Sequence, residues 1–359
     1  MPRNTEDNVG QAPAWLLPRG LIVLLSLAAL VITVAGLKSF AEIVAPVMLA
    51  LMLTVAVHPL PDWLRRKGMH PVPAVIVALV AVYAIVLALV ASLVISVSQL
   101  AEMLPSYADE FDDLVANVKD VFNSAGIDAD QARSLLTDVD STQVFGLVET
   151  LLESFLGVAT NLLFLVTLLL FMAVDGMSYS PRLEVLRQSR SDIAYAVSSF
   201  STGTRRYLVV TTVFGLIVAV LDTAALWALG VPLPVLWGVL SFITNYIPNI
   251  GFVLGLVPPA LLALLEGGPG LMLAVIAIYC VLNVVIQSVI QPKFVGDAVG
   301  LSVTLTFLSL VFWTWVLGPL GAILAVPLTL MAKAFLVDID PSTRWADIFL
   351  SSKPPAEQT

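Results

Sequence analysis

The amino-acid sequence predicts an all-α, polytopic membrane protein, and its composition and long apolar runs are the main reasons. Of its 359 residues, 59% are hydrophobic and 12% are charged, whereas soluble domains carry about 25% charged residues. The apolar residues form long runs rather than alternating stretches of ~10 residues, which excludes an outer-membrane β-barrel. Most runs approach the ~20 residues that a spanning helix needs. The apolar blocks are residues 21–37, 43–57, 72–97, 155–174, 207–229, 236–265, 271–290 and 301–337.

The composition also limits the chemistry that the chain can perform. Cys280 is the single cysteine, so an internal disulfide is excluded, and the two histidines, His58 and His70, flank one short loop. No His/Cys/Asp cluster has metal-ligand spacing, and no phosphate-binding loop of the ATPase type is present. No nucleophile–base pair stands out either. We therefore expect neither an enzyme nor a cofactor, and we expect no ATP-driven step in this chain.

The charges of the polar loops predict the orientation in the membrane. Residues 65–67 are all basic, and the loop 175–206 carries five arginines against three acids. Both loops should be cytoplasmic under the positive-inside rule. The segment 99–154 carries twelve acids and two bases, and should lie outside. Residues 21–37 are then a retained first span rather than a cleaved signal peptide, and both termini are expected in the cytoplasm.

Two apolar blocks are too long for one span and contain breaks. Residues 236–265 are interrupted at 248–251, and residues 301–337 at 317–321, in each case by Pro and Gly. The arm 236–247 would be about 18 Å long, too short for a core of ~30 Å. We therefore predict a re-entrant hairpin entering from outside. The second block has arms of about 24 Å, which could be re-entrant or fully spanning and would enter from the cytoplasm.

These elements suggest an inverted repeat. A helix with an outer hairpin is followed by a helix with an inner hairpin, an arrangement with which many secondary transporters build a midplane site. Two ordinary helices kinked at proline remain the alternative. The predicted organisation is an N-terminal scaffold (1–174) with an acidic extracytoplasmic helical segment (99–154), an amphipathic cytoplasmic linker (175–206), a transport half (207–337) and a cytoplasmic tail (338–359).

The first break contains the most informative candidate residues. Asn245 and Asn249 offer amide donors and acceptors. Pro248 lacks an N–H and Gly251 permits close backbone approach. Broken backbone at membrane depth survives only where it is buried in protein or lines a wet cavity. These four residues are candidates for substrate binding, although the amides could instead cap the broken helix ends.

Further polar positions extend the candidate site. Asn283, Gln287 and Gln291 recur every four residues and should share one helix face. They could line a pathway, or they could join helices by hydrogen bonds of ~1 kcal/mol each. Gly318 and Pro319 would form the matching tip from the cytoplasmic side, or a tight turn between two structural helices.

Asp222 is the one acid well inside a spanning block. An ionised Asp at the bilayer centre costs about 2.5–3.5 kcal/mol on insertion scales, so it needs a partner, water or a proton. It is the candidate for coupling to a proton or cation. It could also reach water at the interface, since the outer end of its helix is two turns away.

Several motifs taken together resemble the autoinducer-2 exporter family of bacterial transporters. They are Asn-Tyr-Ile-Pro-Asn-Ile-Gly at 245–251, Pro258, Gln-Pro-Lys at 291–293, Gly296-x3-Gly300-Leu301-Ser302, Leu-Gly-Pro-Leu-Gly at 317–321 and Val-Pro-Leu at 326–328. The likeness covers nearly the whole chain and implies an oligomeric inner-membrane protein without an ATPase, with a pentamer suspected. Other members look like sodium/proton antiporters or general permeases. Asp222, and Gln291 where many relatives have Glu, depart from the family pattern.

These observations together predict a secondary transporter in the bacterial inner membrane. We expect it to export a small polar signal, similar to autoinducer-2, by alternating access. The other expected partners are the lipid bilayer, a coupling proton or cation and further copies of the chain, but no nucleic acid. A cation/proton antiporter is the alternative, and a non-transporting membrane scaffold, whose acidic outer segment binds a partner, is a second one.

Overall fold

The computed structural model describes residues 18–108, 110, 163–176, 179–248, 250–291 and 301–350. All the labelled elements in this part of the chain are helices. Five of them are long and apolar enough to cross a membrane, or six if the bent pair Leu163–Gly176 and Tyr179–Ser189 is one span. The prediction of an all-α polytopic membrane protein is confirmed. Most of the predicted acidic segment, and the tail beyond 350, lie outside the described residues.

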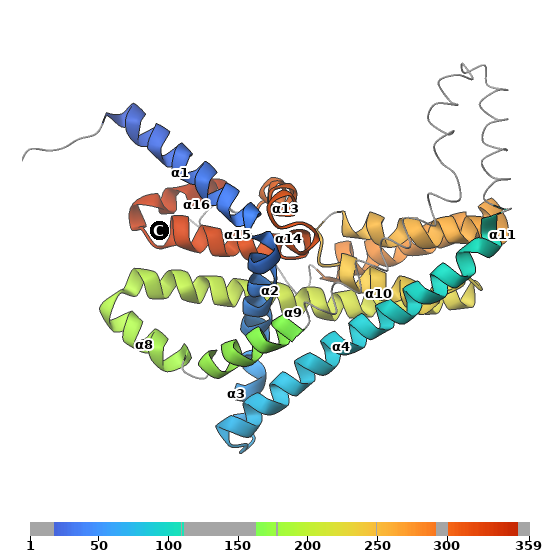
Figure 1. The fold of residues 1–359 in the computed structure, drawn as a ribbon, viewed down its shortest axis with the longest axis horizontal. Coiled ribbons are helices and arrows are strands. Elements are labelled where there is room, and N and C mark those ends of the chain that lie inside the picture. Colours follow the sequence, from blue (N-terminus) through green and yellow to red (C-terminus); the bar gives the residue numbers. More distant parts are fainter. Residues whose placement is uncertain are drawn as a thin grey trace, which may run out of the picture.

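The N-terminal helices are separated by residues that stop or start a helix. Phe40 lies between α1 and α2, Pro59 starts α3, and Gly68, at φ 95°, ends the turn before α4. In Figure 1 the N-terminal part of α1 projects from the molecule, and large apolar residues such as Leu24 are uncovered on it. Such a surface suits lipid rather than water. The elements are α1 (Arg19–Ser39), α2 (Ala41–Val57), α3 (Pro59–Arg66), α4 (Pro71–Met103) and η1 (Leu104–Tyr107).

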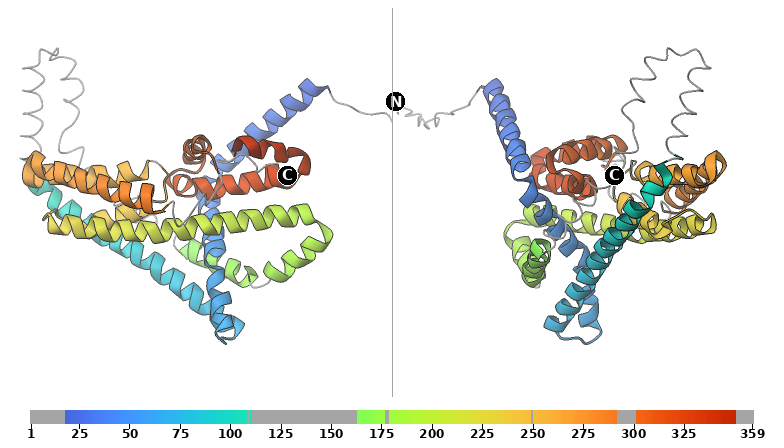
Figure 2. Two further views of the ribbon diagram at one scale, coloured as in Figure 1. Left: turned by 180° about the vertical axis from the view of Figure 1, so that it is seen from behind. Right: turned by 45° about the vertical axis from the view of Figure 1, so that its right-hand side comes forward.

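The long helix α9 (Ser191–Ala228) is the central element of the fold (Figure 1). It follows α8 (Tyr179–Ser189), which lies within the predicted linker. The N-terminal half of α9 packs against α2 and the C-terminal elements, and its other half packs against α10 (Pro234–Thr244) and α11 (Gly251–Asn283). Figure 2 shows these two neighbourhoods at the two ends of the helix. The helix α9 therefore joins the two broken blocks.

The first broken block folds back on itself. The helix α10 ends at Thr244, and α11 begins at Gly251. Leu236, near the start of α10, shares a core cluster with Ala263, so the two arms run antiparallel. Gly268, at φ 74° and ψ −170°, interrupts α11 and separates the returning arm from the following helix, which continues as the π-helix η2 (Val284–Ile290). The break lies where the sequence predicted it, while re-entry into the bilayer stays a prediction.

The second broken block is also bent at its Pro-Gly motif. Gly318, at φ 69°, ends α13 and precedes Pro319, the first residue of α14. Trp313 Nε1 donates to Thr329 Oγ1 across the fold at 3.0 Å, which shows that the chain returns along α13. The elements are α13 (Val303–Leu317), α14 (Pro319–Ile323), α15 (Ala325–Lys333), η3 (Ala334–Asp338), η4 (Pro341–Ala346) and α16 (Asp347–Leu350).

Candidate functional site

A small polar cavity lies where α9, α10, α11 and η2 meet. Its volume is about 10 Å³, enough for about one water molecule. Asn245, Gly251, Asn283, Gln287 and Asp222 were all predicted from the sequence, and all of them line it. Three separate stretches of the chain thus supply one site. The complete lining is Val218, Asp222, Ser241, Thr244, Asn245, Gly251, Phe252, Gly255, Tyr279, Asn283 and Gln287.

Three side-chain amides form a continuous hydrogen-bond network beside this cavity. Asn245 Nδ2 donates to the carbonyl oxygen of Thr211 on α9 at 3.1 Å. Gln287 Nε2 donates both to Asn245 Oδ1, at 3.0 Å, and to Asn283 Oδ1, at 2.7 Å. Asn283 Nδ2 donates to the Tyr279 carbonyl at 2.9 Å. The network therefore ties the tip of the first hairpin to α9 and to the helix that follows the hairpin.

Glycines allow the elements to approach closely enough for this network. A Cβ on Gly251 would lie 1.8 Å from the carbonyl oxygen of Thr244, which the tight turn excludes. A Cβ on Gly215 of α9 would lie 2.7 Å from Asn245 Nδ2. Gly255 lets α11 pass close to the Thr244 hydroxyl, which would lie 3.0 Å from a Cβ there. Gly251 is thus required by the turn, and Gly215 by the position of the amide.

Asp222 is the acidic residue of the cavity and is 1% exposed. Neither of its carboxylate oxygens makes a hydrogen bond of good geometry within the described structure, and the same is true of Ser241 Oγ and Tyr279 Oη. Buried polar atoms normally have partners, and an isolated buried carboxylate is strongly disfavoured in its charged form. The cluster thus provides oxygen atoms suited to a proton, a water or a small cation. The interface-water reading of Asp222 does not fit this burial.

Four of the other predicted site residues, Pro248, Gln291, Gly318 and Pro319, are not among the residues that line the cavity. Pro248 belongs to the turn of the first break, where its carbonyl accepts from Ile250 N at 2.7 Å, and Asn249 lies outside the described residues. Gln291 ends the π-helix. Gly318 and Pro319 form the second break.

Both breaks place apolar side chains at one core cluster. Tyr246 and Ile247 of the first tip pack against the core cluster that contains Leu317 and has Leu320 at its edge. Tyr246 is held in place by its own hydrogen bonds: its carbonyl accepts from Tyr207 Oη at 2.9 Å, and its hydroxyl lies 2.6 Å from Thr212 Oγ1. Both tips therefore border one apolar cluster, and the second contributes no residue to the lining of the polar cavity.

Comparison with known proteins places this chain in a family. Residues 27–340 match the family model described as AI-2E family transporter. This chain belongs to the AI-2E transporter family. The putative transport protein YhhT of Escherichia coli K12 is 30% identical over 337 residues, 93% of this chain and 96% of that protein. The AI-2 transport protein TqsA of the same organism is 31% identical over 317 residues, 88% and 92% of the two chains.

A relative from Haemophilus influenzae, described as a putative transport protein, is 28% identical over 325 residues, 89% of this chain and 93% of that one. The resemblance seen in the sequence motifs is therefore confirmed. Family membership and the apolar helices establish a multi-pass membrane transporter, and they point to transport rather than catalysis.

Sequence reasoning missed several residues of the site in this AI-2E transporter. Ser241 and Thr244, one turn apart on α10, and Tyr279 on α11 line the cavity with the amides. Tyr279 lies one turn before Asn283 and so extends the predicted polar face by one position. The sequence signal was this spacing: Tyr279, Asn283 and Gln287 follow one another at intervals of four. Ser241 and Thr244 carried a weaker signal. Ser and Thr are common in membrane helices, where their hydroxyls often donate a hydrogen bond to a backbone carbonyl of the same helix.

Proposed function

We propose that this AI-2E transporter exports a small, polar, uncharged molecule of the autoinducer-2 type across the bacterial inner membrane. The single observation that carries the proposal is the amide network of Asn245, Gln287 and Asn283, which links three helices around one cavity. The substrate class is in line with the relative described as an AI-2 transport protein. In this proposal the amide network both binds the substrate and links the helices that move during transport.

The chemistry of the lining supports a polyhydroxylated solute. Amides present donors and acceptors together, as a molecule with many hydroxyl oxygens requires. None of the eleven lining residues is Lys or Arg. A phosphorylated and multiply charged substrate would leave its charges uncompensated there. Asp222 would add repulsion to an anion.

Alternating access is supported by the state of the cavity. At about 10 Å³ it is too small for a solute, since small-molecule pockets occupy about 300–1,000 Å³. The α10–α11 hairpin would have to move to admit substrate, and its backbone changes direction at Asn245 and Gly268. Movement of the hairpin would break the bonds of Asn245 to Thr211 and Gln287. A substrate could replace those bonds.

The test is transport by purified protein in liposomes, with efflux and uptake measured under defined substrate and ion gradients. Asn245→Ala should lower the rate for an autoinducer-2-type solute at least tenfold, because it removes the central amide. Thr314→Val is the matched control: its hydroxyl bonds the Leu310 carbonyl of its own helix at 2.6 Å, and it does not line the cavity. Equal rates in Asn245→Ala and Thr314→Val would reject the site.

A second candidate function is cation/proton antiport, which the buried cluster of oxygen atoms of Asp222, Ser241 and Tyr279 favours. In that case Asp222→Asn should abolish ion-driven exchange while preserving the fold, since Asn has the same size. An exporter of uncharged solutes without ion coupling should keep its rate in Asp222→Asn. Comparing the two variants, Asp222→Asn and Asn245→Ala, for both ion flux and solute flux separates the two functions.

We also propose the predicted orientation, with both termini in the cytoplasm, and an assembly of several copies. The basic end of α3, with Arg65, Arg66 and the capping Lys67, is in line with a cytoplasmic loop. The Lys67 ammonium lies 3.9 Å from the centroid of the Trp63 ring, and Trp63 is a typical residue of the membrane interface. Single cysteines introduced at positions 67 and 268 should label from opposite sides of the membrane.

A further inference from the structure

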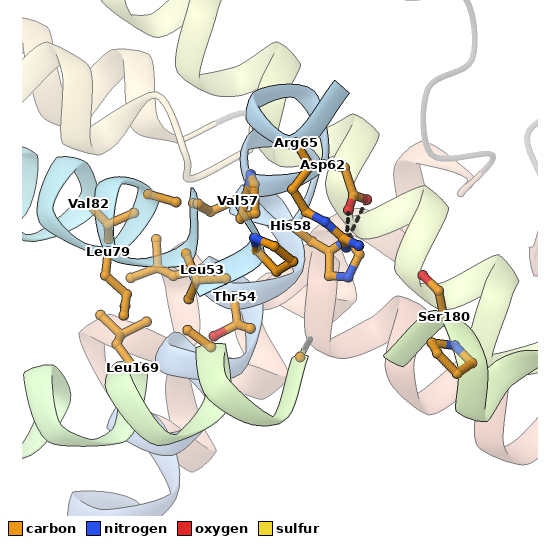
Figure 3. Close-up of a pocket in the computed structure, with 17 residues that line it drawn as sticks. Leu53, Thr54, Val57, His58, Asp62, Arg65, Leu79, Val82, Leu169 and Ser180 are labelled. Atoms are coloured by element: carbon orange, nitrogen blue, oxygen red, sulfur yellow. Dashed lines mark ion pairs between the residues drawn. The ribbon is translucent and has the colours of Figure 1, made fainter. Parts of the chain in front are cut away.

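A second and much larger cavity lies between the N-terminal helices, away from the transport site. Its volume is about 370 Å³, within the range of small-molecule pockets. Its walls are formed by α2, α3, the first half of α4, the helix Leu163–Gly176 and the start of α8 (Figure 3). None of its lining residues lines the polar cavity described above. The two cavities are therefore separate sites.

The deep part of this cavity is apolar. Leu53 on α2, Leu79 and Val82 on α4 and Leu169 on the helix Leu163–Gly176 point their side chains into it (Figure 3). Its α4 wall runs from Pro71 to Val82, a length of about 16 Å along the helix. A slot of this length between helices that cross the membrane matches a hydrocarbon chain rather than a compact solute.

The other end of the cavity is polar and accessible. Asp62 Oδ2 lies 3.5 Å from His58 Nδ1, and Asp62 Oδ1 lies 3.8 Å from Arg65 Nη1. The side chains of Asp62 and Arg65 are 41% and 50% exposed, so this end opens outward. The His58 ring packs edge-on against Tyr179 at the start of α8, and the next two residues, Ser180 and Pro181, line the cavity. The cavity is thus apolar inside and charged at its mouth.

The segment of α3 that borders the mouth is basic. Residues 58–67 hold three cationic side chains, Arg65, Arg66 and Lys67, against the single acid Asp62. Asp62 holds Arg65 and His58 at the opening and neutralises only one of the cations. Basic clusters next to membrane helices attract anionic lipids, and basic pockets between such helices bind their head groups. Charge complementarity therefore points to an anionic amphiphile.

We propose that this cavity binds an anionic phospholipid, with one acyl chain along α4 and its phosphate at Arg65 and His58. The membrane supplies such a ligand continuously, and the chain would fill a void that otherwise lacks contacts on its walls. Because α8 and Tyr179 lie at the mouth and Tyr179 Oη lies 2.8 Å from Ser201 Oγ of α9, the lipid contacts the junction between the N-terminal helices and the transport half. The inference does not depend on the identity of the substrate.

Head-group selectivity is the first test. Native mass spectrometry of the full-length protein is carried out in detergent with phosphatidylglycerol or phosphatidylethanolamine of identical chains. We expect tighter binding of phosphatidylglycerol, and we expect Arg65→Gln to weaken it about fivefold, the effect of one basic residue near an anionic lipid. Arg187→Gln, which removes an exposed arginine paired with Glu184 on α8, should have no effect. Equal binding of the two lipids, or no loss in Arg65→Gln, overturns the proposal.

The position of the acyl chain is the second test. Its main measurement uses the wild-type protein, so it does not depend on a variant that folds correctly. Phosphatidylglycerol with a photoreactive diazirine in its tail is crosslinked to the wild-type protein in vesicles, and adducts are mapped. We expect them at Leu79 and Val82 in preference to Val80, which is 59% exposed on the outer side of α4. Ala78→Phe, which fills the cavity, should remove these adducts, and Val80→Phe should not. Adducts spread evenly over α4, or cavity walls protected by a second copy of the chain, overturn the proposal.

Discussion

The two helix breaks look alike in sequence but are built differently in the structure. Each is a Pro-Gly interruption of an apolar block, and each lets the chain fold back. At the first break Asn245 joins α9 and η2 by hydrogen bonds. At the second, Gly318 N donates to the Thr314 carbonyl at 2.9 Å, and the side chains around it are apolar. A break therefore marks a fold-back, whereas the polar residues beside it mark a binding site.

The breaks also share one feature, a glycine where no side chain fits. A Cβ at Gly251 would lie 1.8 Å from the Thr244 carbonyl oxygen, and a Cβ at Gly321 would lie 2.0 Å from the Trp313 carbonyl oxygen. In both cases the obstacle is backbone, which cannot move aside without opening the hairpin. Both breaks thus require a glycine for the close approach of the chain, but only the first break contributes polar residues to the cavity.

Replacing these glycines should give the largest effects. Gly251→Ala and Gly321→Ala should each destabilise the protein by on the order of 3 kcal/mol or more, the range of severe backbone and packing defects. Both should lower the yield of folded protein and the midpoint of thermal unfolding in detergent. Gly36→Ala on α1, where a Cβ meets nothing within 4 Å, is the control and should be neutral or slightly stabilising. A wild-type midpoint in either tip variant would contradict the close approach.

Two glycines of α9 test the chemical difference. A Cβ at Gly215 would displace the Asn245 amide, whose Nδ2 lies 2.7 Å from it, whereas a Cβ at Gly203 would meet the flexible Leu330 at 3.3 Å. Gly215→Ala should therefore reduce transport about tenfold, and Gly203→Ala should leave it within twofold. Both replacements gain up to ~1 kcal/mol of helix propensity, so Gly203→Ala should not unfold earlier. Equal transport by the two variants would show that the position of Asn245 does not matter.

The breaks and part of the site could be predicted from the sequence because their signals are local. Pro and Gly interrupt a helix wherever they stand, and the four-residue spacing of Asn283 and Gln287 predicts a shared face. Both residues line the cavity with Asp222, although nothing in the sequence indicated that Asp222, on another helix, would lie beside them. Such a long-range meeting depends on how α9 packs against the hairpin.

The extent of the site was harder to predict than its centre. The four-residue spacing was extended to Gln291, which follows the π-helix of residues 284–290 and is not among the residues that line the cavity. Ser241 and Thr244 gave only a weak signal, because Ser and Thr hydroxyls in apolar helices mostly bond their own backbone. Thr244 does so, donating to the Leu240 carbonyl at 2.9 Å, and it lines the cavity nevertheless.

A smaller effect is expected from the one cross-arm hydrogen bond described for the second hairpin. Trp313→Phe removes the bond from Nε1 to Thr329 Oγ1 and should cost about 1 kcal/mol. Transport should stay within twofold, because neither residue lines the polar cavity. The coupling energy from a double-mutant cycle with Thr329→Val isolates this bond. A large transport defect without loss of stability would give the second hairpin a chemical role and narrow the difference between the breaks.

The smallest effect should come from the contact between α1 and the second hairpin. The Lys38 ammonium lies 4.1 Å from the centroid of the Trp315 ring, which is 57% exposed. An exposed cation–π contact contributes about 0.5–1 kcal/mol, so Lys38→Met should lower the thermal midpoint slightly and Lys38→Arg should restore it. Transport should not change in either variant, since α1 has no contact with the polar cavity among the described residues. If Lys38→Met alone altered transport, the second hairpin would be a moving part whose rate depends on α1, and the two breaks would differ in mobility as well as in chemistry.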